Sequence, residues 1–154
     1  MGIGNVRSLL RREELTAKEY LKQYEYAAKR IKRLEEELND ERIMIDSVRS
    51  LSDNDGLPHG SGISKPTEDR AIRLADKLSE LVQARLEAIE LRREVFNVVQ
   101  KVDGVPGDVL FARYIKLMKW DEVSAYVNYS WKWTHHYHRI GLEIVSELIG
   151  HKTT

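Results

Sequence analysis

The residues with the most chemical potential lie close together near the C-terminal end of the chain. From Trp131 to Arg139 the sequence reads WKWTHHYHR, which contains two indoles, three imidazoles and two permanent cations. Cations bind phosphate, imidazoles donate hydrogen bonds, and flat rings offer apolar surface. This combination suits the major groove of DNA, and an exposed indole also suits docking on a protein.

The three histidines, His135, His136 and His138, raise the alternative of a zinc site. Only His135 and His138 share a helix face, and neither a cysteine nor a nearby acid completes a tetrahedral set. We therefore expect no bound metal. The imidazoles can still donate to phosphates, and their protonation would make binding depend on pH near about 6.5.

No recognised catalytic motif occurs anywhere in the sequence. The chain has no Walker loop, no glycine-rich dinucleotide fingerprint, no His-Glu-x-x-His and no nucleophile elbow. We therefore expect a protein that is not an enzyme and that needs no cofactor.

The elements that position these residues are predicted to be helices separated by short turns. An apolar-periodic segment follows Gly107 and Asp108, and a two-turn helix is predicted for 120–127, with acidic residues in its first turn. Asn128 tolerates the positive φ of a turn, and Ser130 is predicted to cap a last helix that runs to about Ile149. This is the layout of a helix-turn-helix.

The last helix is predicted to bury one face and to display the other. The predicted buried positions are Thr134, Tyr137, Leu142, Val145 and Leu148. Phe111, Tyr114, Trp120 and Tyr137 are assigned to packing. Trp131 and Trp133 cannot both face inward, because alternate positions diverge around a helix, so at least one indole should be exposed.

The N-terminal two thirds of the chain predict two long helices. Residues 5–55 and 67–103 contain neither glycine nor proline, whereas 52–66 hold three glycines and two prolines and are expected to form a flexible loop. Apolar positions recur at coiled-coil spacing at Ala17, Leu21, Tyr24, Ala28, Ile31, Leu38, Ile45 and Val48, and again at Ile72, Ala75, Val82, Leu86, Ile89, Phe96 and Val99. We expect these stripes to cover each other in an antiparallel hairpin, or to form a dimer interface.

Composition favours a soluble protein of the reducing cytoplasm. The 154 residues are 42% hydrophobic and 32% charged, with no cysteine and no apolar run long enough to cross a membrane. The 25 basic and 25 acidic side chains cancel. The segment 109–142 is nevertheless basic and holds most of the aromatic residues. We therefore predict an all-α protein with a coiled-coil-like hairpin in 1–103 and a helix-turn-helix domain in 104–154.

The strings Arg113-Tyr114-Ile115, Lys119-Trp120-Asp121-Glu122-Val123-Ser124 and Asn128-Tyr129-Ser130 resemble region four of bacterial sigma factors. The whole layout is similar to small phage-encoded proteins allied to the ArpU and RinA-like late transcription regulators. The resemblance implies a regulator that binds double-stranded promoter DNA, with RNA polymerase as a further partner and a homodimer or higher homo-oligomer as its assembly. It implies a DNA face made of Ser130, Trp131, Lys132, Trp133, His135, His136 and Arg139.

Two other functions fit the same pattern. Small terminase subunits, which package DNA, also join a helix-turn-helix to oligomerising helices. A structural adaptor would instead dock its aromatic helix on a protein and never contact DNA. A large ring in solution would favour the first, and exposed indoles favour the second.

Overall fold

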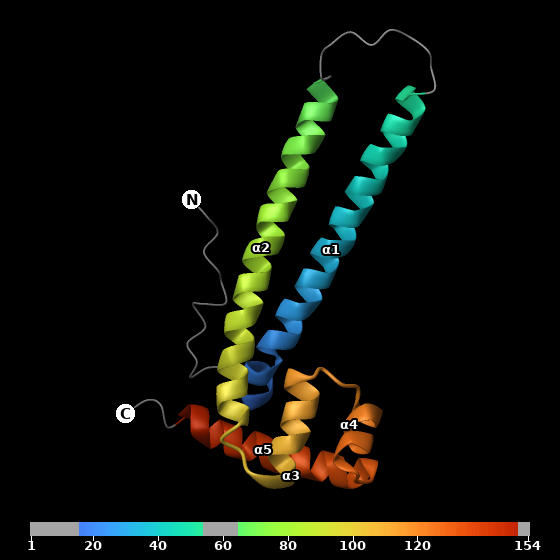
Figure 1. The fold of residues 1–154 in the computed structure, drawn as a ribbon. Coiled ribbons are helices and arrows are strands. Elements are labelled where there is room, and N and C mark those ends of the chain that lie inside the picture. The colour runs from blue at the N-terminus through green and yellow to red at the C-terminus, as the bar shows by residue number, and fades with distance from the viewer. Residues whose placement is uncertain (1–15, 54–64, 151–154) are drawn as a thin grey trace. The chain divides into compact units, whose positions relative to one another are not determined.

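The computed structural model describes residues 16–53 and 65–150, and within these ranges the chain is helical without any strand. Its elements are α1 (Ala17–Asp53), α2 (Lys65–Val99), α3 (Gly104–Leu110), the short π-helix η2 (Phe111–Ile115), α4 (Trp120–Val127) and α5 (Trp131–Gly150) (Figure 1). The predicted all-α class is confirmed. Among the helices of the described ranges, none combines the length and the apolar character needed to cross a bilayer.

The chain divides into two compact units. Of the described residues, the first unit contains 16–26 and 88–150, and the second contains 27–53 and 65–87, so both long helices contribute to each unit. The domain boundary expected after residue 103 stays a prediction, because the two compact units do not measure which parts of the chain fold independently. Most of the predicted loop 52–66 lies outside the described residues. α2 begins at Lys65, two residues before the expected start at Thr67.

In the second unit α1 and α2 run side by side in opposite directions (Figure 1). Lys77 of α2 pairs with Glu37 and Glu41 of α1 at 3.7 and 3.4 Å, and Arg85 of α2 pairs with Glu35 of α1 at 2.6 Å. These side chains are between 30% and 61% exposed, so each pair contributes little to stability. The ion pairs fix the antiparallel direction more than they stabilise the unit.

The stripe of α2 that is buried differs from the predicted one. The predicted positions Ile72, Ala75, Val82, Leu86, Ile89 and Phe96 are exposed, and only Val99 of that set is buried. The covered positions are instead Leu74, Leu81, Ala84, Ala88, Leu91, Val95 and Val98. Both sets follow a seven-residue repeat, and at about 100° per residue they lie about 130° apart around the helix. The predicted buried stripe of α2 therefore had the correct seven-residue spacing but was placed on the wrong side of the helix.

The stripe predicted for α1 is covered over most of its length. Ala17 and Leu21 are buried, and Tyr24, Ala28, Ile31, Leu38 and Ile45 are partly buried, whereas Val48 is exposed. The helix begins with a capping box, in which the Thr16 backbone N–H donates to Glu19 Oε2 at 3.0 Å and the Glu19 N–H donates to Thr16 Oγ1 at 3.3 Å.

The first unit has a core to which the helix ends and the C-terminal helices all contribute. Leu21, Val95, Tyr114 and Val145 come from α1, α2, η2 and α5, and each is at most 1% exposed. A smaller cluster of Val109, Ala112 and Val123 packs α3 and η2 against α4. Because α5 reaches both clusters through its partly buried side chains, it is held along most of its length.

α3 begins earlier than the sequence predicted. Its first residue is Gly104, at φ 75°, so Val105, Pro106 and Gly107 lie inside the helix rather than before it. Proline is tolerated in the first turn, where its missing N–H would have no helical partner. Leu117 has φ 57° and lies beyond the end of η2.

Candidate nucleic-acid interface

α4 and the turn that follows it agree with the sequence prediction. α4 spans Trp120–Val127, and Glu122 Oε2 accepts a hydrogen bond from the Lys119 backbone N–H at 2.8 Å. Asn128 has φ 58° and ψ 44°, which is the left-handed conformation. Ser130 Oγ then accepts from the Trp133 N–H at 3.3 Å and caps α5. Three local signals therefore set the angle at which α5 leaves the turn.

The inner face of α5 is formed by Thr134, His138, Gly141 and Val145. Of the residues predicted for this face, Thr134 and Val145 are buried, and Tyr137, Leu142 and Leu148 are partly buried. Thr134 Oγ1 donates to the Ser130 carbonyl oxygen at 2.9 Å, so its hydroxyl is satisfied within the helix. Gly141 is needed for a close approach, because a Cβ there would lie 2.9 Å from Leu110 Cδ1.

His138 is the polar residue of this face that the sequence prediction missed. Its Nε2 lies 2.8 Å from Tyr114 Oη, and both side chains are buried. Burial lowers the pKa of His138 to about 4, with further lowering by the nearby His135, Lys18 and Arg113. Burial also raises the pKa of Tyr114. The spacing from Thr134 and Val145, four and seven residues, would have placed His138 inward.

Trp120 lies at the centre of a cluster that joins η2, α4 and α5. The Arg113 guanidinium lies 5.1 Å from the indole centroid, and Arg113 Nη1 donates to the Met118 carbonyl oxygen at 2.7 Å. The His135 and His138 rings lie 4.3 and 4.7 Å from Trp120 on the α5 side. Trp120 thus has the packing role expected of it, and Arg113 anchors the segment that leads into α4.

The exposed cations of α5 lie on one outward stripe. Lys132 and Arg139 are exposed and His136 is half-buried, and all three lie opposite the inner face. Arg139 Nη2 is 3.4 Å from His136 Nδ1, so the two side chains lie together. Ser130 is exposed at the beginning of this stripe. The acidic Glu143 and Glu147 follow on the same side, which confines the basic part to the N-terminal half of α5.

The two exposed indoles flank this stripe on opposite sides. Trp131 and Trp133 are 61% and 52% exposed and, at about 100° per residue, lie about 160° apart around the helix. The Trp131 ring stacks on His135 at 4.0 Å, and the Trp133 ring contacts His136 at 5.2 Å. His135 is held between Trp131 and Trp120. The predicted face is therefore a stripe of Lys132, His136 and Arg139 with an indole at each edge, and His135 supports one of these edges.

The histidines do not assemble a metal site in the part of the chain that the structure describes. The His135 and His138 rings are 6.4 Å apart, and no group of three or more histidine, cysteine, aspartate or glutamate side chains gathers there. His138 Nε2 already contacts the Tyr114 hydroxyl. His135 lies against the rings of Trp120 and Trp131, and His136 lies against Trp133 and Arg139.

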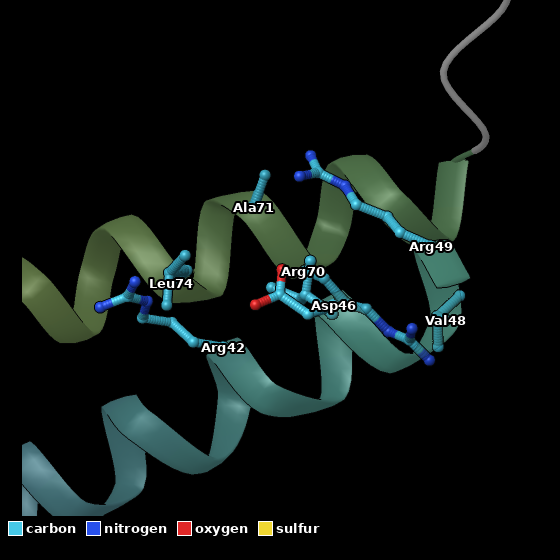
Figure 2. A pocket seen from close by; sticks show the side chains of 8 residues that line it. Arg42, Asp46, Val48, Arg49, Arg70, Ala71 and Leu74 are labelled. Atoms are coloured by element: carbon cyan, nitrogen blue, oxygen red, sulfur yellow. The ribbon is translucent and has the colours of Figure 1, made fainter. Parts of the chain in front are cut away.

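A cavity of about 430 Å³ in the second unit was not anticipated from the sequence. Figure 2 shows Arg42 and Arg49 extending from α1 towards α2, and Arg70 extending from α2 towards α1. The full lining is Arg42, Ile45, Asp46, Val48, Arg49, Arg70, Ala71 and Leu74. It holds three guanidinium groups and one carboxylate.

Comparison of the chain with protein-family models, with curated proteins and with solved structures gave no match.

Proposed function

We propose that the chain is a DNA-binding transcriptional regulator of a phage or prophage, an activator of late genes. In this proposal α4 and α5 act as a helix-turn-helix similar to region four of sigma factors, and the N-terminal half of α5 enters the major groove. The long helices dimerise or hold a partner such as RNA polymerase. The regulator acts in the bacterial cytoplasm.

The observation that carries the proposal is the outward stripe of Lys132, His136 and Arg139 directly after the capped turn. In helix-turn-helix proteins the N-terminal residues of the second helix contact base edges. These three side chains occupy the first two to three turns of α5 and point away from its packed face. Glu143 and Glu147 further along would repel phosphate, which supports contact through the N-terminal half alone.

The proposed interface is small, so its affinity depends strongly on salt. Each phosphate that a cation neutralises changes the slope of log affinity against log salt by about 0.9. Lys132 and Arg139 together account for a slope change of up to about 2. A single module of this kind binds modestly, and pairing of two chains would raise its effective affinity.

A salt titration of binding to a pool of random-sequence duplex DNA tests the proposal. The double variant Lys132→Ala, Arg139→Ala should bind more weakly and lose up to about 2 from the salt slope. The matched control is Arg73→Ala, Lys101→Ala, which removes the same charge from exposed positions outside α5. Equal binding of the wild type and the α5 variant, with helix content preserved, would remove the proposed face.

The exposed indoles favour a second candidate, an adaptor that docks α5 on a protein. Large aromatic side chains that are more than half exposed are typical of binding hot spots. Trp131→Ala, Trp133→Ala distinguishes the two functions. A DNA reader should keep its salt slope in this variant, because no phosphate contact is removed, whereas an adaptor should show no DNA binding in either form.

A further inference from the structure

α2 carries a second apolar stripe that the rest of the described chain leaves exposed, apart from Phe96 at its end, whose ring lies 6.3 Å from that of Phe111. Ile72, Val82, Leu86 and Ile89 are between 53% and 57% exposed. The complete repeat alternates Ile72, Ser79, Leu86 and Arg93 with Ala75, Val82, Ile89 and Phe96. Because all these residues lie on one helix, the helix itself fixes their spacing. We refer to them as the outer stripe.

The spacing of the outer stripe specifies the kind of partner. A seven-residue repeat keeps a stripe aligned with another helix at a shallow crossing angle, so the partner surface is a helix of similar length. Covering this stripe in two chains would bury on the order of 1,000 Å² in total, at the lower end of specific protein interfaces. The stripe is therefore large enough for a specific helix pair.

The charges beside the outer stripe differ in sign between its two edges. Arg85 and Arg92 lie along one edge, and Asp69, Asp76 and Glu90 lie along the other, all of them exposed. In a parallel pair of identical helices the basic edge of one meets the acidic edge of the other. In an antiparallel pair each edge would meet its own kind. The stripe is thus complementary to itself in the parallel orientation alone.

We propose that the outer stripe pairs with the outer stripe of a second copy of this chain, with the two α2 helices parallel. In this register Arg85 of one copy faces Glu90 of the other, in addition to its existing bond to Glu35 of its own chain. Arg93 stands at a core position of the repeat. Ser79 also stands at such a position, and polar residues there fix register in two-stranded coils at some cost in stability.

Parallel pairing has a consequence for the region that follows α2. The carboxyl ends of both α2 helices lie at the same end of the pair, so both copies of residues 104–150 continue from that end. The idea that pairing brings two DNA-binding regions to one duplex rests on the proposed function. The pairing itself does not, and it is measured without DNA, so that failure of either proposal is recognised separately.

The mass of the full chain in solution, measured by light scattering over a concentration series, tests the pairing. The wild type should be a dimer, and Val82→Gln, Leu86→Gln should raise its dissociation constant by about 100-fold or more, because it buries four polar side chains per dimer. Both residues are exposed in the single chain, so the variant should keep its helix content. The control Ile43→Gln, Met44→Gln removes equally exposed apolar side chains from α1 and should remain dimeric.

Cysteine cross-linking tests the orientation, since the chain has no cysteine of its own. Ala75→Cys and Ile89→Cys, made separately, lie about 21 Å apart along α2. Both should form disulfide-linked dimers with an added oxidant if the helices are parallel and in register, whereas an antiparallel pair can link at one position at most. A monomeric wild type, a dimer that survives Val82→Gln, Leu86→Gln, or cross-linking at one position only would overturn the proposal.

Discussion

Protonation of His138 should destabilise the fold in mildly acidic solution. The side chain is 8% exposed, and its pKa is lowered from 6.5 in the unfolded chain to about 4 in the folded protein. The folded protein therefore favours the neutral imidazole. The stabilisation is complete above about pH 6.5, decreases as the pH falls towards 4, and changes no further below that value.

The size of this effect follows from the difference between the two pKa values. Each unit of pKa difference corresponds to about 1.4 kcal/mol, so the full difference amounts to about 3 kcal/mol. Between about pH 7.5 and about pH 5 the free energy of unfolding should fall by about 2 kcal/mol through His138 alone. That amount is a large fraction of the stability of an ordinary domain.

Urea denaturation followed by circular dichroism at the two pH values measures this loss. His138→Gln cannot titrate at this position, so its stability should change about 2 kcal/mol less than that of the wild type. Tyr114→Phe removes the hydrogen bond but leaves the imidazole buried. It should keep most of the pH dependence, because burial is the largest cause of the lowered pKa. The reasoning is refuted if the wild type and His138→Gln lose equal stability.

Five further substitutions test local features of the first unit. Asn128→Ala should cost about 1 kcal/mol, because a Cβ-bearing residue without a short polar side chain is disfavoured at φ 58°, whereas Asn128→Gly should be close to neutral in the same denaturation experiment. Gly107→Ala should cost about 3 kcal/mol, since its Cβ would lie 1.9 Å from the Val102 carbonyl oxygen. Gly150→Ala, whose added Cβ would meet no side chain and no distant backbone atom within 4 Å, should change the free energy of unfolding by less than about 0.5 kcal/mol. Arg113→Lys keeps the charge but loses the planar guanidinium, so the melting temperature should fall. An unchanged melting temperature would show that the hydrogen bond to the Met118 carbonyl oxygen and the contact with the Trp120 ring contribute nothing.

The parts of the fold that neighbouring residues determine could be predicted from the sequence. The bounds of α4, the left-handed Asn128 and the Ser130 cap all depend on contacts within about four residues. The acidic first turn of α4 and the short polar side chains beside it act through the adjacent backbone. Such signals are local, so no knowledge of the remaining chain was needed.

The parts that depend on distant contacts could not be predicted in the same way. α2 has two stripes of the same period, and only the position of α1 decides that Leu81 is covered and Val82 is exposed. His138 is buried because Tyr114, 24 residues away in the sequence, accommodates its imidazole. Of the predicted site, Lys132 and Arg139 are exposed, and the separation of the two indoles follows from helix geometry alone, whereas the position of His135 against Trp120 depends on the packing of α4.

The positions of the tryptophans allow local unfolding to be followed by fluorescence. All three lie between residues 120 and 133, so tryptophan fluorescence reports on α4 and the beginning of α5. The far-ultraviolet circular dichroism signal of α1 and α2 reports on the backbone elsewhere. Trp120 lies against two imidazoles and a guanidinium, and the other two indoles face solvent. Fluorescence and circular dichroism recorded during the same thermal unfolding would show whether α4 and the beginning of α5 unfold before α1 and α2, without any attached dye.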